Sequence, residues 1–304
     1  MRKIILFIIL SGILFTSCGR STEEQQRISK EERQRLHRED SLALKIAVMP
    51  TLDCLPLYLA KEKHYFDTLG IDVRLKRFNA QMDCDTALAG GSVEGAVTDL
   101  VRASRLNQKV MPLDFVSSTN AYWTLVANHK ARLKKTDQLG DKMIAMTRYS
   151  ATDFLTEKAL QGVKTSAQVF KIQINDVNIR LSMLLNNEMD ALWLTEPQAT
   201  IALAAGHGKL YDSRDTGISL GVIAFSHKKI SDERRQQQMK AFLTAYNRAC
   251  DSISNRGLSH YQDILTKYYG LTTKQIQSLP PVRFSHATSP RTSDINAAEQ
   301  WLKQ

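Results

Sequence analysis

Polar side chains that could bind a small molecule follow several short apolar segments of this chain. One group lies in the first third of the sequence and comprises Thr51, Asp53, Asn79, Gln81, Thr98 and Asp99. A second group lies further along and comprises Arg148, Ser150, Thr152, Asn175, Trp193 and Glu196. Hydroxyl, amide and carboxylate groups form hydrogen bonds, and one guanidinium adds positive charge. These residue types favour recognition of a polar ligand.

Signatures of catalysis and of metal binding are weak. The seven histidines show no metal-ligand spacing, and neither a Gly-x-Ser-x-Gly nor a Cys-x-x-Cys sequence occurs. The Gly90–Ser92 segment lacks the Lys-Ser/Thr pair of a phosphate-binding loop. We therefore predict a binding protein that is not an enzyme and that needs no cofactor and no metal.

Short apolar runs alternate with helix-length segments from residue 44 onward. Predicted strands cover 45–49, 71–78, 95–98, 143–146, 169–174 and 191–194. Predicted helices between them include 55–62, 83–89, 152–161 and an amphipathic segment from Val177. Strands that alternate with helices indicate parallel β-α-β units.

The two halves of this region contain a faint internal repeat. Residues 88–99 and 184–196 both end a helix, pass through a polar turn, form a strand and finish with a Thr-acid pair. Chance similarity between short turns is the alternative. If the repeat is real, the chain forms two similar Rossmann-like α/β lobes.

Two further strand-like segments lie where the chain would cross between such lobes. They cover 122–128 and 219–226, and two crossings make a hinge. We expect lobe one to comprise 44–123 plus 222–304, and lobe two to comprise 124–221. Tyr122 and Trp123 alternate faces, so only one should face a crevice; we take Tyr122 as the candidate. A helix over 231–254, with an apolar stripe, should pack on lobe one.

The N-terminus has the layout of an export signal. Two cations precede an apolar stretch, and small polar residues lead to Cys18, in a pattern that resembles a bacterial lipobox. We expect 1–17 to be a signal peptide and Cys18 to be lipidated; an ordinary signal peptide with a chance cysteine is the alternative. Residues 18–43 should form a charged, solvated tether, because 20–40 holds six residues of each sign.

Composition excludes several classes. The 304 residues are 43% hydrophobic, as in globular proteins, and no uninterrupted apolar run is long enough for a protein with several membrane spans. The net charge of +10 does not by itself indicate a nucleic-acid partner, because basic residues must first cluster on one face. We expect a monomer, anchored to a bacterial membrane and facing the periplasm.

Several segments together resemble a known family. They cover 57–63, 65–73, 88–94, 139–145 and 189–197. In their order they resemble type II periplasmic solute-binding proteins of ABC importers, in the branch for nitrate, sulfonates, taurine and the pyrimidine precursor of thiamine. The resemblance implies two lobes that close on a small organic ligand and deliver it to a permease driven by an ATPase. Asp53-Cys54 departs from the small polar residues that sulfonate and nitrate members often carry there.

The ligand class stays open between two chemistries. Ligands of open α/β sheets sit beyond the carboxyl ends of the strands, which would place both polar groups in a crevice between the lobes. Asp53, Asp99 and Glu196 favour a ligand with N–H donors, such as an aminopyrimidine, and we lean towards it. Helix N-termini and Arg148 favour an anion such as a sulfonate.

Structural roles are the alternatives for several of these residues. Ser150 and Thr152 could be helix caps that contact no ligand. Asp53, Asp99 and Glu196 could accept hydrogen bonds from neighbouring amides instead of from a ligand. Trp193 could belong to the core. Cys54 and Cys84 follow neighbouring strands, so the export compartment allows a disulfide, with two free thiols as the alternative. A ligand sensor or surface protein on the same scaffold, or a pyrimidine-synthase-like enzyme, are the competing functions.

Overall fold

The structure is a computed structural model that describes residues 22–304, with side chains from Ser29 onward. The predicted signal peptide 1–17 and the predicted lipidation site Cys18 lie outside the described residues. The described chain forms two units, the helix α1 (Thr22–Leu42) and a body from Leu44 to Gln304.

Helix α1 is continuous and strongly charged. Arg35 pairs with Glu32 at 2.6 Å and with Glu39 at 3.7 Å, which are the i,i+3 and i,i+4 spacings of neighbours on a helix surface. The predicted tether is thus helical from Thr22 onward. No helix within residues 22–304 is both long and apolar enough to cross a membrane.

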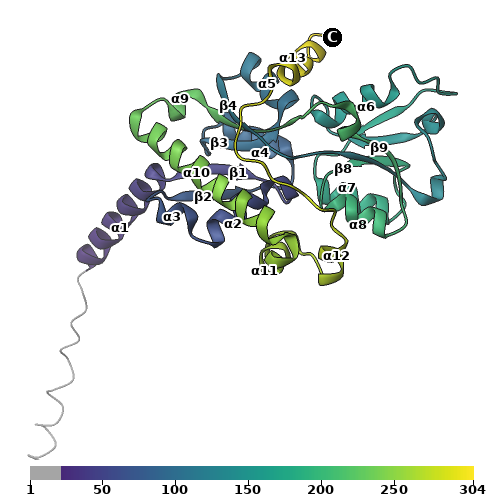
Figure 1. Ribbon diagram of the computed structural model, residues 1–304. Coiled ribbons are helices and arrows are strands. Elements are labelled where there is room, and N and C mark those ends of the chain that lie inside the picture. Colours follow the sequence, from purple (N-terminus) through teal and green to yellow (C-terminus); the bar gives the residue numbers. More distant parts are fainter. Residues whose placement is uncertain (1–21) are drawn as a thin grey trace, which may run out of the picture. The chain divides into compact units, whose positions relative to one another are not determined.

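The body contains two five-stranded mixed sheets, which form separate groups of strands in Figure 1. In spatial order the first sheet comprises β2 (Val73–Arg77), β1 (Leu44–Val48), β3 (Gly95–Asp99), β10 (Gly221–Ser226) and β4 (Leu113–Ser118). The second comprises β7 (Phe170–Gln173), β6 (Met143–Met146), β8 (Ala191–Leu194), β5 (Thr124–Ala127) and β9 (Gly208–Asp212). We call the first sheet with its helices lobe one, and the second sheet with its helices lobe two.

The two sheets share one topology. Strand β1 pairs in parallel with β2 and β3, and β6 pairs in parallel with β7 and β8. Each sheet then gains an antiparallel strand from the segment that follows a crossing between lobes: β5 beside β8, and β10 beside β3. The fold predicted from the sequence, two similar α/β lobes connected twice, is confirmed.

Helices surround both sheets. After α1 they are α2 (Leu55–Glu62), α3 (Tyr65–Thr68), α4 (Gln81–Ala89), α5 (Leu100–Lys109), α6 (Ala151–Leu160), α7 (Val177–Leu185), α8 (Gln198–Ala204), α9 (His227–Ile230), α10 (Glu233–Arg256), α11 (Gln262–Tyr269), α12 (Thr273–Ser278) and α13 (Thr292–Trp301). Short 3-10 turns cover Leu52–Cys54, His129–Ala131, Thr136–Leu139, Ser213–Thr216 and Leu258–Tyr261.

The alternation of side chains in β1 separates two apolar clusters. Ile46 and Val48 pack with α2 and α10, whereas Ala47 points to the opposite face, where the cluster continues into lobe two. The predicted long helix is α10, capped by Asp232, whose carboxylate accepts the N–H of Arg235. Its predicted apolar stripe is buried at Phe242 and Tyr246 against lobe one.

Candidate ligand-binding site

The carboxyl ends of the strands in the two lobes face each other and are joined by direct hydrogen bonds. The Leu52 N–H donates to the Glu196 carbonyl at 2.7 Å, and the Val177 N–H donates to the Asn79 carbonyl at 3.2 Å. The Gln198 amide reaches across to the Pro50 carbonyl at 2.9 Å. The lobes are therefore closed on each other in this structure.

A cavity of ≈ 30 Å³ lies between the lobes. Its lining residues come from both lobes and from the first crossing: Met49, Thr51, Asp53, Gln81, Val97, Thr98, Ala121, Trp123, Val177, Arg180 and Thr195. A single water needs about 10–15 Å³ on this measure, so the closed cavity holds very few atoms. A larger ligand must enter while the lobes are apart, and it would hold them further apart than they are here.

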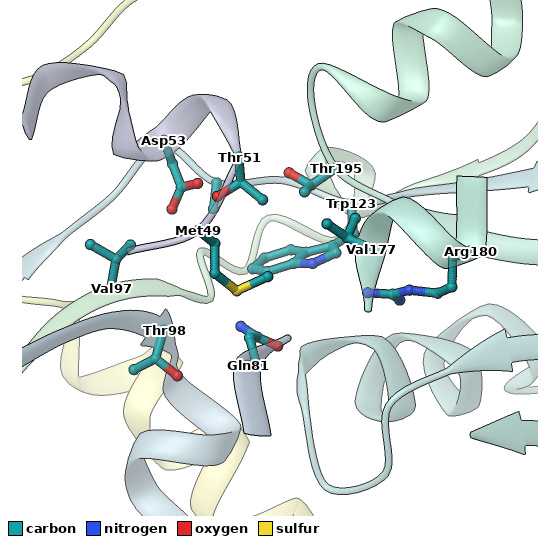
Figure 2. A pocket seen from close by; sticks show the side chains of 11 residues that line it. Met49, Thr51, Asp53, Gln81, Val97, Thr98, Trp123, Val177, Arg180 and Thr195 are labelled. Atoms are coloured by element: carbon teal, nitrogen blue, oxygen red, sulfur yellow. The ribbon is translucent and has the colours of Figure 1, made fainter. Parts of the chain in front are cut away.

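Asp53 is the acid of this cavity. It lies in the turn between β1 and α2, and its Oδ2 accepts the Thr119 hydroxyl at 3.1 Å. Burial raises the pKa of Asp53, while hydrogen bonds from Thr51 and Thr119 act in the opposite direction. Figure 2 shows its carboxylate beside the Thr51 side chain. Asp53 thus offers a buried acceptor on the lobe-one side.

Arg180 is the cation of the cavity, and it is not among the ligand-binding residues predicted from the sequence. It lies in the first turns of α7, which begins after the cap Asp176. Only 6% of Arg180 is exposed, and within the described residues its Nε and Nη1 have no hydrogen-bond partner. Burial lowers its pKa to about 10, and the charge of Asp176 opposes the shift. The signal was available, because Val177, Arg180 and Leu184 share the buried face of the helix.

Trp123, rather than Tyr122, lines the cavity. Trp123 lies among the lining residues, with its ring near Met49 in Figure 2. The Tyr122 hydroxyl instead donates to Glu196 Oε1 at 3.0 Å, and the Arg214 guanidinium lies 4.0 Å from the centre of its ring. Of the two alternating aromatic residues, the structure thus places Trp123 in the cavity wall and Tyr122 outside it.

Two of the three predicted crevice acids bond protein groups instead. Glu196 Oε2 accepts the Thr200 N–H at 3.1 Å, at the start of α8. Asp99 Oδ1 caps α5 by accepting the Arg102 N–H at 3.0 Å. Burial raises the pKa of Asp99 to about 6, although Arg102 and the Ala151 N–H lower it. Neither acid lines the cavity.

The remaining lobe-two candidates lie elsewhere. Ser150 caps α6 by accepting the Thr152 N–H, and the Thr152 hydroxyl accepts the Thr147 N–H. Arg148 is exposed and borders a separate groove beside Trp301. Trp193 is fully buried, and its Nε1 donates to the Thr156 hydroxyl at 2.8 Å, so it presents no surface to a ligand.

Two predicted amide side chains also stay outside the cavity. Asn79 is exposed and contributes its backbone carbonyl to the contact between lobes. The Asn175 side chain accepts from Gln173 Nε2 at 3.2 Å. The lining residues that the sequence did select are Thr51, Asp53, Gln81 and Thr98.

Cys54 and Cys84 are separate buried thiols, so the disulfide that the sequence allowed is not formed. Cys54 belongs to the cluster with α2 and α10, whereas Cys84 belongs to the cluster on the other side of the sheet. The helices that follow β1 and β2 thus carry the two thiols to opposite faces. Among residues 22–304, no group of histidine, cysteine or acidic side chains is placed to hold a metal ion.

Two α/β lobes around a shared cavity define the periplasmic-binding-protein fold. More particularly, the chain belongs to the NMT1/THI5-like family, whose model matches residues 51–256. A comparison with curated proteins finds no match.

Solved structures share the fold at low identity. A ligand-binding component of an ABC-type import system from Staphylococcus aureus, with zinc bound, has a TM-score of 0.71 at 17% identity, covering 86% of this chain and 91% of that chain. The alkanesulfonate-binding protein SsuA from Xanthomonas axonopodis pv. citri, bound to MOPS, has 0.70 at 16%, covering 86% and 91%. The nitrate-binding protein NrtA from Synechocystis PCC 6803 has 0.66 at 16%, covering 83% and 74%.

Proposed function

We propose that this protein is the substrate-binding lipoprotein of an ABC importer, which captures a small organic molecule between its lobes and delivers it to a permease with its ATPase. The observation that carries the proposal is the cavity at the carboxyl ends of both sheets, lined by Asp53 and Thr98 on one side and by Arg180 and Thr195 on the other. A ligand that touches both lobes stabilises the closed state by its differential affinity. The two crossings would serve as the hinge.

Family membership and the importer proteins among the solved structures support this role. The candidate ligands are the two classes considered from the sequence: an aminopyrimidine related to thiamine precursors, or a sulfonate. Delivery to a permease also requires the protein to be outside the cytoplasm. We propose anchoring through lipid at Cys18 and a monomeric protein on the periplasmic side of the membrane.

Binding is favoured over catalysis by the composition of the cavity wall. Among the described residues, those that line the cavity include no histidine and no cysteine. The alternatives of a ligand sensor or surface protein would use the same cavity without a permease. Gene neighbours that encode a permease and an ATPase would distinguish transport from these roles.

Native mass spectrometry of the purified protein, followed by scattering with the co-purified molecule, tests the function. The mass should reveal one small ligand, and the radius of gyration should fall when that ligand is added back to stripped protein. A tight ligand that leaves the radius unchanged contradicts hinge closure, and its chemical conversion on the protein contradicts the binding role. Labelled palmitate should enter the protein and not a Cys18→Ala variant.

A further inference from the structure

The cavity contains a buried cation whose donors are not used by the protein. Within the described residues, Arg180 Nε and Nη1 have no hydrogen-bond acceptor. The nearby acid Asp176 uses Oδ1 to accept the N–H groups of Asn178 and Ile179. Burying a guanidinium without an acceptor is costly, so an anionic group in the cavity would stabilise the closed state.

The other polar groups that line the cavity are mostly able to donate hydrogen bonds. The Thr98 hydroxyl is buried and has no partner within the described residues. The Gln81 amide and the Thr195 hydroxyl also face the cavity (Figure 2). Hydroxyls and amides complement the oxygen atoms of an acid group. Together with Arg180, these groups suit an oxyanion in the cavity.

The end of the cavity opposite Arg180 carries a hydrogen-bond acceptor, Asp53. In Figure 2, Asp53 and Arg180 lie on opposite sides of the Trp123 ring, and they belong to different lobes. Asp53 is the carboxylate among the lining residues, whereas Asp99 and Glu196 cap helices outside the cavity. A carboxylate in such a position binds N–H donors.

We propose that the ligand is a compact acid that also carries an N–H donor group, with its oxyanion bound by Arg180 of lobe two and its nitrogen end bound by Asp53 of lobe one. This inference rests on the proposed function and names its substrate class. It also replaces the preference for an uncharged aminopyrimidine, because two of the three acids behind that preference are used elsewhere. A ligand with both ends connects the lobes, whereas a single-ended molecule contacts only one.

Four small probes distinguish binding of the acid group from binding of the amine. β-Alanine and 2-aminoethylphosphonate carry both groups and are called double-ended probes. Propionate carries only the acid, and propylamine carries only the amine. Calorimetry on the stripped full chain should detect binding of at least one of the two double-ended probes. It should detect weaker binding of propionate and of propylamine. Arg180→Gln should lower the affinity for the double-ended probe by about thirtyfold or more, as expected when one partner of a buried charged pair is lost. It should leave the affinity for propylamine unchanged.

Two more variants serve as controls: Arg180→Lys, which keeps the charge, and Arg74→Gln, which removes an arginine away from the cavity. Arg180→Lys keeps the charge and guards against a folding defect, yet should still weaken the oxyanion because it loses the planar pair of donors. Arg74 pairs with Asp72 on the surface of lobe one, so Arg74→Gln should bind like the natural protein. Because Nε and Nη1 of Arg180 are buried without a hydrogen-bond partner among residues 22–304, Arg180→Gln should not lower the melting temperature of the stripped protein. A fall of several degrees would assign Arg180 a structural role.

Three results overturn the proposal. They are failure of both double-ended probes to bind, equal binding by the Arg180 variants, and a co-purified ligand with no acidic group. A co-purified ligand with no acidic group that nevertheless closes the lobes would contradict this proposal but agree with the proposed function. Absence of any ligand-induced closure would instead contradict the proposed function itself.

Discussion

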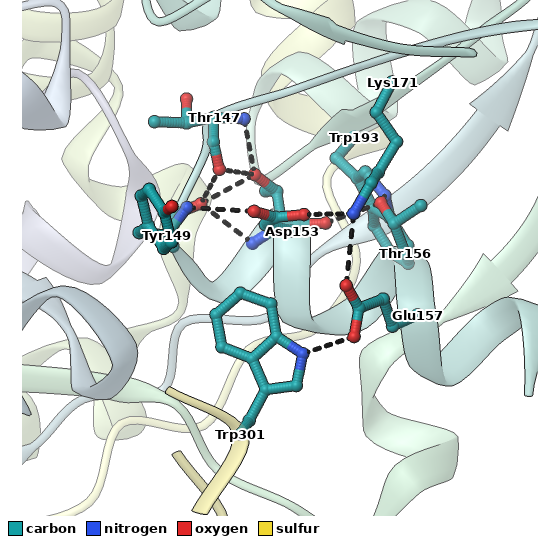
Figure 3. A network of polar contacts seen from close by, with 10 residues as sticks. Thr147, Tyr149, Asp153, Thr156, Glu157, Lys171, Trp193 and Trp301 are labelled. Atoms are coloured by element: carbon teal, nitrogen blue, oxygen red, sulfur yellow. Dashed lines mark hydrogen bonds and ion pairs between the residues drawn. The ribbon is translucent and has the colours of Figure 1, made fainter. Parts of the chain in front are cut away.

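Trp301 and Glu157 connect the C-terminal helix to lobe two: the indole Nε1 donates to Glu157 Oε2 at 2.6 Å (Figure 3). The Trp301 ring also meets Phe154 edge-on, with 5.9 Å between ring centres. Helix α13 otherwise packs on α5 of lobe one, whereas Glu157 and Phe154 belong to α6 of lobe two. Opening of the lobes should therefore break this pair or move α13 with lobe two.

Trp301→Phe should shift the stripped protein towards the open state. Phenylalanine keeps the aromatic contact with Phe154 but loses the hydrogen bond to the carboxylate, which is worth about 1.5–3 kcal/mol for a charged acceptor. Small-angle scattering should show a larger radius of gyration than for the natural protein, and the ligand should bind more weakly. Gln300→Ala, at an exposed position of the same helix, is the control. An unchanged radius in Trp301→Phe would mean that this pair does not restrain opening.

Asp99→Asn should remove one source of pH dependence in stability. Burial raises the pKa of Asp99 to about 6, from the ordinary value of 3.8 for an aspartate side chain. Between these values the folded state binds the extra proton, so the contribution of Asp99 to the free energy of unfolding falls as the pH rises and is lost above about 6. The change amounts to up to about 3 kcal/mol.

Urea unfolding at several pH values between about 4 and 7 measures this difference. The natural protein should lose stability relative to Asp99→Asn as the pH rises through that range. Asp263→Asn removes an exposed carboxylate of α11 and should follow the natural protein. A constant difference between the natural protein and Asp99→Asn would show that Asp99 is ionised throughout.

Asp53→Asn and Glu196→Gln should separate binding from stability. Asp53 lines the cavity, so its amide variant should weaken the ligand at least about tenfold, since hydrogen bonds to charged groups are worth more than 1.4 kcal/mol. Glu196 bonds Tyr122 and the start of α8, so Glu196→Gln should lower the unfolding free energy by about 1–2 kcal/mol with little effect on affinity. Calorimetry and urea unfolding of both variants test this, and the opposite assignment would place Glu196 in the site.

The sequence predicted the central strands and the edge strands β2 and β7, but it missed the other two edge strands. Strand β1 was expected at 45–49 and lies at Leu44–Val48, where four of the five residues are apolar and buried. Strands β4 and β9 were not predicted, since each is an edge strand that mixes polar and apolar residues. Strong periodicity needs a buried face, and edges provide only part of one.

The same physics limited the prediction of the site. The alternation of Tyr122 and Trp123 establishes that they face opposite ways but not which one faces the cavity. Helix capping and ligand binding require the same residue types, so Ser150 and Glu196 were ambiguous until their partners were known. Arg180 was not predicted, because a single arginine among the apolar residues of the helix from Val177 gives no sign of whether its side chain is buried or exposed.

The described cysteines should all be free thiols that react slowly in the folded protein. Cys54, Cys84 and Cys250 are buried, and burial raises the pKa of each thiol, to about 12 for Cys250. Little reactive thiolate then exists at neutral pH, and reagents cannot reach the sulfur atoms. A Cys18→Ser variant, unfolded without reductant, should therefore show three reactive thiols, and the same variant should show almost none while folded. Reduction before unfolding is the control and should leave the count at three. A count of one in the unreduced sample, restored to three by the reductant, would instead establish a disulfide between two of these cysteines.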